Sequence, residues 1–101
     1  AMIERTDLDR DKALGVLTSG APGSPMVKYM LPRMTAHDYT PNFLMRLLAK
    51  DLTYAIAEAK SHGLDLRTGE TSLKALQDAM PKSANQDMSA VVELFRGQRQ
   101  E

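Results

Sequence analysis

The chain of 101 residues contains no cysteine. Disulfide bonds, cysteine nucleophiles and thiolate zinc sites are therefore excluded, and the composition is compatible with a reducing compartment. Lys plus Arg equals Asp plus Glu at 13 each, whereas a nucleic-acid-binding surface normally needs a basic excess. The sequence also lacks an apolar run near the ~20 residues of a transmembrane helix, and its first residues do not have the layout of a signal peptide. We expect a cytoplasmic protein without a nucleic-acid or membrane partner.

Sequence motifs of self-sufficient active sites are also missing. The GAPGSP segment at residues 20–25 has two glycines, but it lacks the ending of a P-loop and no strand precedes it, so it is interpreted as a helix–helix turn. His37 and His62 are far apart and no HExxH motif occurs, so we expect no metal site. No residue is assigned a catalytic role.

What the chain does have is an ordinary globular composition, with 43% hydrophobic and 26% charged residues. No segment shows the sustained period-two alternation of a strand. We therefore expect an all-α fold, an irregular bundle of about five helices around one long central helix. The length is that of one domain, here spanning residues 1–101.

The turn and capping residues indicate where the helices begin and end. The expected helices cover about residues 7–19, 25–34, 41–61 and 70–80, and a last helix follows Asp87, its expected N-cap. Thr6 or Asp7 is the expected cap of the first helix, and Ser24 with Pro25 begins the second. Pro32 either kinks or ends the first part of the second helix.

Three further signals concern the later connections. Gly63 is a good residue to close the long helix. The loop LDLRTGE follows it, and its Leu64 and Leu66 are expected to pack back onto the core. Pro81 is expected to terminate the fourth helix.

The long helix raises a question, because FLMRLLAKDLTYAIAEA at residues 43–59 carries Lys50 and Asp51 among apolar residues. A helical projection that starts at Phe43 places both charges beside a narrow apolar strip of Phe43, Leu47 and Tyr54. Asp51 points between Leu44 and Leu47 in this projection. A second, broader apolar arc contains Leu44, Leu48, Leu52, Ala55, Ile56 and Ala59.

Two interpretations of Lys50 and Asp51 remain open from the spacing. Lys50 extends from a helix edge and Asp51 pairs with a cation or caps another helix. Alternatively, the strip faces a cleft or second domain, where Lys50 presents its charge to an anionic or carbonyl ligand and Asp51 holds it in place.

The segment with Phe43, Leu47, Lys50, Asp51 and Leu52 reads F-x-x-x-L-x-x-K-D-L, and it precedes an alanine-rich helix that ends at Gly63. This pattern resembles the C-terminal helical domain of the β-hydroxyacid dehydrogenases, which include 3-hydroxyisobutyrate dehydrogenase and are related to 6-phosphogluconate dehydrogenase. A D-x-S-A-V segment, residues 87–91, stands at the matching distance downstream, and LTSGAPGSPMVKYMLPRM is also similar to the family. The resemblance covers about residues 7–95.

The resemblance implies that an N-terminal Rossmann domain binds NAD or NADP and that the helical domain closes over the nicotinamide. By position, Lys50 would contact the cofactor, and Phe43 and Asp51 would shape the site beside it. The family's general acid/base lysine lies in an upstream K-x-x-N-N motif that this chain lacks, as it lacks the dinucleotide fingerprint. Lys82 and Ala84 occupy positions where the family has glycines, which puts substrate preference in doubt.

The leading hypothesis is therefore the cleft-forming helical domain of an NAD(P)-dependent oxidoreductase acting on a small 3-hydroxy acid or semialdehyde, inactive when isolated. Its implied partners are its own Rossmann domain, the substrate and, as is common for such domains, further copies of itself. The opening Ala1-Met2 is compatible with an expressed piece of a longer protein. The alternative is a free-standing helical module that binds a partner through the strip of Phe43, Leu47 and Tyr54.

Overall fold

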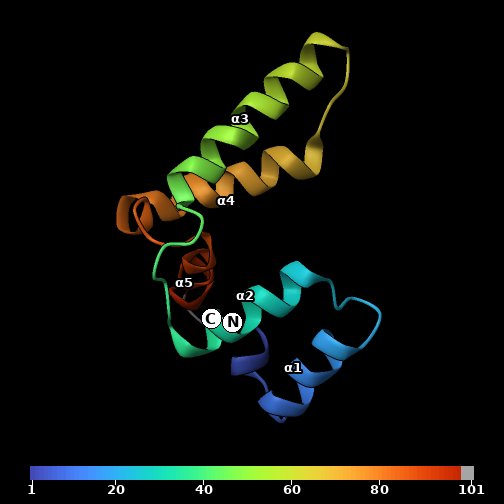
Figure 1. The fold of residues 1–101 in the computed structure, drawn as a ribbon, viewed down its shortest axis with the longest axis vertical. Coiled ribbons are helices and arrows are strands. Elements are labelled where there is room, and N and C mark those ends of the chain that lie inside the picture. The colour runs from blue at the N-terminus through green and yellow to red at the C-terminus, as the bar shows by residue number, and fades with distance from the viewer. Residues whose placement is uncertain (99–101) are drawn as a thin grey trace. The chain divides into compact units, whose positions relative to one another are not determined.

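The computed structural model describes residues 1–98, which are helical with short connections (Figure 1). The elements in chain order are η1 (Ile3–Arg5), α1 (Arg10–Ser19), α2 (Pro25–Ala36), α3 (Met45–Ser61), α4 (Arg67–Ser83), η2 (Met88–Val91) and α5 (Val92–Arg96). Within these described residues the only β-type pairing is an isolated antiparallel bridge between Leu44 and Asp87. The expected all-α fold with five helices is confirmed. The chain forms two compact units, residues 1–38 and residues from 39 onward.

In the first unit, side chains cap the starts of both α-helices. The Asp9 carboxylate accepts a hydrogen bond from Lys12 N at 2.9 Å, so the cap of α1 is Asp9 and not the expected Thr6 or Asp7. Thr6 instead donates its hydroxyl to the Ile3 carbonyl at 2.8 Å. Ser24 caps α2 as expected, because its hydroxyl accepts from Val27 N at 3.2 Å.

The turn between α1 and α2 depends on glycine. A Cβ atom at Gly23 would lie 2.1 Å from the Thr18 carbonyl oxygen, so no other residue fits without a shift of the backbone. The segment 20–25 is thus the helix–helix turn that the sequence predicts. α2 then runs through Pro32 to Ala36, so Pro32 does not end it.

The second unit contains the hydrophobic core. α3 and α4 form an antiparallel hairpin (Figure 1), and its inner faces meet through small and long apolar side chains. η2 covers one end of this layer and α5 follows it directly. The buried cluster consists of Met45, Ala49, Leu76, Ala79 and Ala90.

Two expectations about the hairpin are wrong. α4 extends to Ser83 with Pro81 inside it, because Ala79 and Ser83 on either side of the proline are buried and their packing outweighs the lost N–H group. Leu64 and Leu66 are both exposed and do not pack back onto the core. α4 begins at Arg67, so part of the expected loop is helical.

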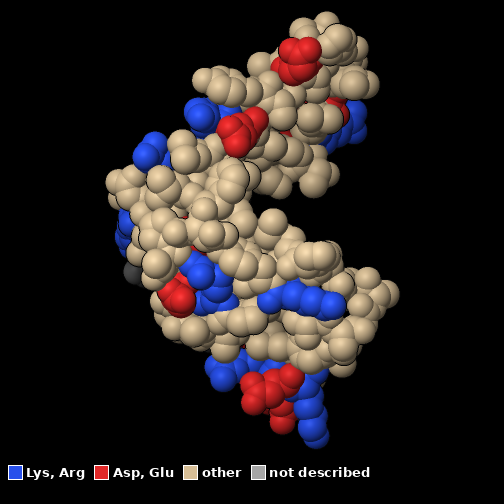
Figure 2. All heavy atoms as spheres, in the orientation of Figure 1, with Lys and Arg blue, Asp and Glu red and all other residues tan. Residues whose placement is uncertain are grey.

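The surface of the second unit carries charges of both signs. Figure 2 shows lysine and arginine side chains interspersed with aspartate and glutamate on the visible face of the α3–α4 hairpin. Two exposed ion pairs lie on this unit, Lys60 with Glu70 at 3.1 Å and Lys74 with Asp78 at 2.6 Å.

Between residues 1 and 98, no helix combines the length and the apolarity that crossing a membrane requires.

Candidate functional site

Lys50 and Asp51 lie on the side of α3 that faces away from the core. The side chains buried on α3 are Met45, Ala49, Ile56 and Ala59. At about 100° per residue, Leu47, Lys50, Asp51 and Tyr54 fall within an arc of about 100° that is centred roughly opposite these buried residues. Lys50, Asp51 and Tyr54 are exposed, Tyr54 to 65% of its surface. We call this arc of four residues the outer face of α3.

The structure also corrects the details of the helical projection. Leu44 is the N-cap of α3 and Phe43 precedes it, so neither belongs to the helix and Asp51 does not point between two leucines. In the broader arc, Leu48 and Leu52 pack against the core and Ile56 is buried as expected, but Ala55 is exposed.

The roles suggested for the Asp51 carboxylate are not observed in residues 1–98. Asp51 caps no helix and pairs with no cation there, and it makes no ion pair with Lys50. Neighbouring residues in a helix point about 100° apart, so an i, i+1 pair does not meet. Lys50 likewise has no side-chain partner within the described part of the chain, and its ammonium is available to another group.

Phe43 is held in place through its backbone. Its N–H donates to Asp87 Oδ1 at 3.0 Å, and its carbonyl accepts from Met88 N at 2.8 Å. The residue is 37% exposed. Phe43 therefore presents part of its ring to solvent just before the first turn of α3, while the residues around 87 determine its position.

Asp87 is the buried polar centre of this arrangement. Its Oδ1 atom accepts from Asn42 N and Phe43 N at 3.0 Å each, and its Oδ2 atom accepts from the backbone and the hydroxyl of Ser89 at 3.0 and 2.5 Å. Burial alone would raise the pKa of this carboxyl, but the hydrogen bonds from Ser89, Phe43 and Asn42 outweigh it and hold the pKa well below its usual range. The group is a fully buried, charged and satisfied acceptor.

The first turn of α3 depends on the same region. Leu44 has no side-chain acceptor for a cap, and the free N–H groups of a helix start need partners. Met45 N donates to the Gln86 carbonyl at 3.0 Å and Arg46 N donates to the Ala84 carbonyl at 3.1 Å. Carbonyl groups from the α4–η2 connection thus replace a side-chain cap.

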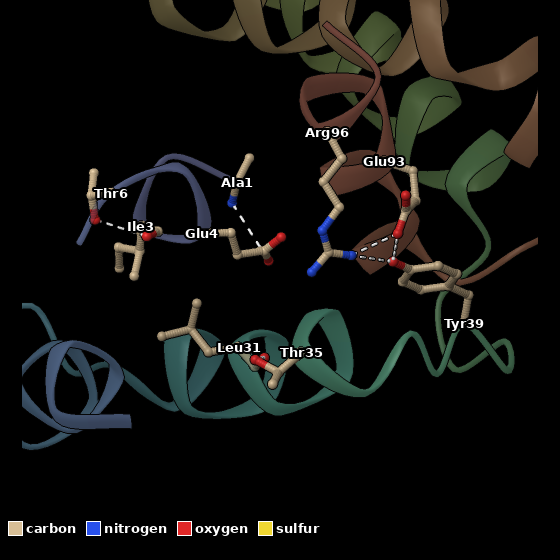
Figure 3. A network of polar contacts seen from close by, with 9 residues as sticks. All are labelled: Ala1, Ile3, Glu4, Thr6, Leu31, Thr35, Tyr39, Glu93 and Arg96. Carbon is tan, nitrogen blue, oxygen red and sulfur yellow. Dashed lines mark hydrogen bonds and ion pairs between the residues drawn. The ribbon is translucent and has the colours of Figure 1, made fainter. Parts of the chain in front are cut away.

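A second polar cluster joins the segment before α3 to α5. Tyr39 donates its hydroxyl to the Glu93 carboxylate, and Arg96 Nη1 donates to Tyr39 Oη at 3.0 Å and to Glu93 Oε1 at 2.6 Å (Figure 3). Burial, together with the hydrogen bond and charge of Glu93, raises the pKa of Tyr39 to about 12, although Arg96 opposes this. An open cavity of about 750 Å³ lies beside the cluster, and Phe43, Lys50 and Asp51 are not among its lining residues.

Residues 1–98 contain no group of three or more His, Cys, Asp or Glu side chains that could hold a metal ion. His62 pairs with Glu58 at the end of α3, and His37 ends α2 in a left-handed conformation.

Sequence reasoning selects Lys50, Asp51 and Phe43 as candidate site residues but does not anticipate the long-range contacts of Asp87. The sequence predicts Asp87 as the N-cap of the last helix, and its carboxylate does accept from Ser89 N at the start of η2. Its partners Asn42 and Phe43 are 45 and 44 residues away. No local pattern connects positions so far apart.

Known proteins resemble this chain in sequence and in structure. Residues 1–95 match the family described as NAD-binding of NADP-dependent 3-hydroxyisobutyrate dehydrogenase. An uncharacterized oxidoreductase of Bacillus subtilis (strain 168), YkwC, is 29% identical over 80 residues, which cover 79% of this chain and 27% of that protein. The crystal structure of 3-hydroxyisobutyrate dehydrogenase (ygbJ) from Salmonella typhimurium is similar with a TM-score of 0.86 and 26% identity.

That structural match covers 93% of this chain and 33% of the Salmonella protein. The chain thus spans about a third or less of the length of these two relatives. The resemblance seen in the F-x-x-x-L-x-x-K-D-L and D-x-S-A-V segments is confirmed over nearly the whole sequence. This chain belongs to the NAD-binding helical domain family of the 3-hydroxyisobutyrate dehydrogenases, within the β-hydroxyacid dehydrogenases.

Proposed function

We propose that this chain is the helical domain on the nicotinamide side of the cleft in an NAD(P)-dependent β-hydroxyacid dehydrogenase. The parent enzyme would transfer hydride between the nicotinamide and a small 3-hydroxy acid or semialdehyde. The observation that carries the proposal is the position of Lys50, which lies exposed on the outer face of α3 without a side-chain partner in the described residues. Family membership supplies the class of ligand that such a cation would meet.

The residues present suit a nicotinamide cofactor. Lys50 offers a positive charge for a phosphate or carbonyl oxygen, and the part-exposed ring of Phe43 offers an apolar wall to a planar group. Asp51 adds a free carboxylate on the same face, where it can accept hydrogen bonds from the cofactor or substrate. When bound, the nicotinamide supplies the hydride chemistry, and these three side chains bind and orient.

The missing part of the cleft would be a Rossmann domain of the same protein. The chain lacks a dinucleotide fingerprint, and the two relatives are about three times as long. We therefore propose that cofactor binding depends mainly on that other domain and that the isolated 101-residue chain does not catalyse hydride transfer.

Replacement of Lys50 in the full-length protein tests the proposal. Losing a hydrogen bond to a charged group costs about 1.5–3 kcal/mol, so Lys50→Ala should lower kcat/KM or cofactor affinity by roughly 10- to 100-fold. The melting temperature should stay unchanged because the side chain is exposed. Lys74→Ala, which removes an exposed lysine paired with Asp78 on α4, is the matched control. Unchanged kinetics in Lys50→Ala would refute the site assignment.

The exposed ring of Tyr54 favours one alternative, a helical module whose outer face binds another protein. The same variants separate the two functions. A binding module would respond to Tyr54→Ala in partner affinity, whereas NADH and NADPH titrations of the full-length protein would not respond to Lys50→Ala.

A further inference from the structure

The two sequence segments that mark this family meet at one carboxylate. Asp87, at the start of D-x-S-A-V, accepts from the N–H groups of Phe43, which begins the F-x-x-x-L-x-x-K-D-L segment, and of Asn42 directly before it. The four donors to its two oxygens come from positions 42, 43 and 89, and the carboxylate is fully buried. Asp87 itself therefore cannot touch a cofactor on the exposed outer face of α3.

The contacts around Asp87 determine where α3 starts. The Asp87 N–H donates to the Tyr39 carbonyl at 2.9 Å, and Met88 N donates to the Phe43 carbonyl at 2.8 Å. Together with the isolated bridge between Leu44 and Asp87, these bonds pair the residues before α3 with the residues before η2. The first two N–H groups of α3 then donate to carbonyls at 84 and 86.

The start of α3 in turn sets the directions of its exposed side chains. If the chain of α3 slipped by one residue relative to the groups that hold its start, its side chains would be rotated by about 100°. Lys50 lies five residues after Met45, so its height above the helix start is about 7.5 Å. The position of Phe43 relative to Lys50 thus depends on the contacts that surround Asp87.

We infer that Asp87 is a positioning residue for the cofactor-binding side chains Phe43 and Lys50. It acts through the backbone of Asn42 and Phe43 rather than by contact with a ligand. The inference rests on the proposed function, because it assumes that Phe43 and Lys50 meet the cofactor. Asp87→Asn keeps the shape but removes the charge and introduces an NH2 group where the carboxylate accepts. At least one of the four donors then loses its acceptor.

A double-mutant cycle in the full-length protein tests this role. Affinities for NADH and NADPH are measured for Asp87→Asn, Phe43→Ala and the double variant. Asp87→Asn should raise the Kd of the bound cofactor by roughly 10-fold or more. In the Phe43→Ala background the same change should add little, because groups that act through one another are not additive.

A matched variant separates positioning from general destabilisation. Leu73→Ala removes a half-buried side chain that packs against the α3–α4 core, and its effect on Kd should be small and additive with Phe43→Ala. Hydrogen–deuterium exchange should accelerate in the segment 40–48 for Asp87→Asn, whereas it should accelerate in α4 for Leu73→Ala. Ser89→Ala, which removes only the hydroxyl donor at 2.5 Å, is the milder variant should Asp87→Asn not fold, and it should move Kd in the same direction.

The outcomes distinguish this inference from the proposed function. If Phe43→Ala and Lys50→Ala leave Kd unchanged, Phe43 and Lys50 do not bind the cofactor, and both the proposed function and the positioning role of Asp87 are overturned. If those two variants weaken binding but Asp87→Asn and Ser89→Ala do not, or if their effects add to that of Phe43→Ala, only the positioning role is overturned.

Discussion

Arg96 Nη1 donates a hydrogen bond of 3.0 Å to the hydroxyl of Tyr39, 57 residues earlier in the chain. Tyr39 in turn donates to Glu93, which also accepts from Arg96 at 2.6 Å. The closed triangle fastens α5 to the segment that leads into α3. Tyr39 and Asp87 both attach that segment through polar contacts, and they differ in charge and in burial.

Tyr39→Phe should lower the free energy of unfolding by about 1 kcal/mol, the typical net value of one hydrogen bond. The pKa of Tyr39 is raised to about 12 in the folded protein. The contribution of its hydroxyl to stability is therefore complete below pH ~10, the unfolded pKa, and is lost as the pH rises through the folded pKa. Ultraviolet absorbance of tyrosinate, followed as the pH is raised, measures the pKa of Tyr39 in the folded protein. The difference between the wild-type and Tyr39→Phe curves should show a step near pH 12, and a step at the ordinary tyrosine value would contradict the cluster.

Asp87→Asn should lower the free energy of unfolding by about 2–3 kcal/mol at neutral pH, because a buried charged acceptor loses bonds. The pKa of Asp87 lies below its usual range in the folded protein, so its contribution is present above the unfolded pKa and is lost as the pH falls below ~4. Urea unfolding at several pH values measures this, and the free energy of unfolding should fall less steeply with decreasing pH in the variant than in the wild type.

Asp78→Asn is the control for that measurement. Asp78 is exposed and pairs with Lys74, so the variant should cost less than about 1 kcal/mol. Equal losses in Asp78→Asn and Asp87→Asn would show that the burial of Asp87 contributes nothing.

Two glycines should respond to alanine in opposite directions. Gly63 has φ +73 and closes α3 through bonds from Gly63 N to Lys60 O and from Leu64 N to Ala59 O, so Gly63→Ala should cost about 1 kcal/mol from backbone strain. Gly15 lies inside α1 with open space where a Cβ atom would stand, and Gly15→Ala should stabilise the helix by up to about 1 kcal/mol. Thermal unfolding measures both. Gly63→Asn should be milder than Gly63→Ala, since asparagine tolerates this conformation.

Two methionines provide a test of the core. Met45 is 0% exposed at the centre of the buried cluster, so Met45→Ala should cost about 2–5 kcal/mol through lost burial and the cavity left behind. Met26 is 54% exposed in α2, and Met26→Ala should change stability by less than about 0.5 kcal/mol. Comparable losses measured by denaturant unfolding would contradict this location of the core.

Much of the fold can be predicted because its signals are local. The caps at Ser24 and Asp87 and the left-handed Gly63 follow from residue type and neighbouring sequence, and each occurs in the structure. Helix ends near proline are less predictable. The preference against α conformation before Pro81 is weak enough to be overridden by the burial of Ala79 and Ser83.

In the candidate site too, some features follow from local sequence and others depend on contacts between distant segments. The helical class, the family and the candidate residues Lys50, Asp51 and Phe43 could be predicted from the sequence alone, because spacing along one helix and short motifs carry that information. Three further facts follow from the folded chain: Phe43 lies outside α3, Lys50 and Asp51 face away from the core, and Asp87 holds the start of the helix. Those facts depend on the packing of the buried face of α3 and on hydrogen bonds between segments far apart in the chain, such as those from Asn42 and Phe43 to Asp87, and no local periodicity encodes them.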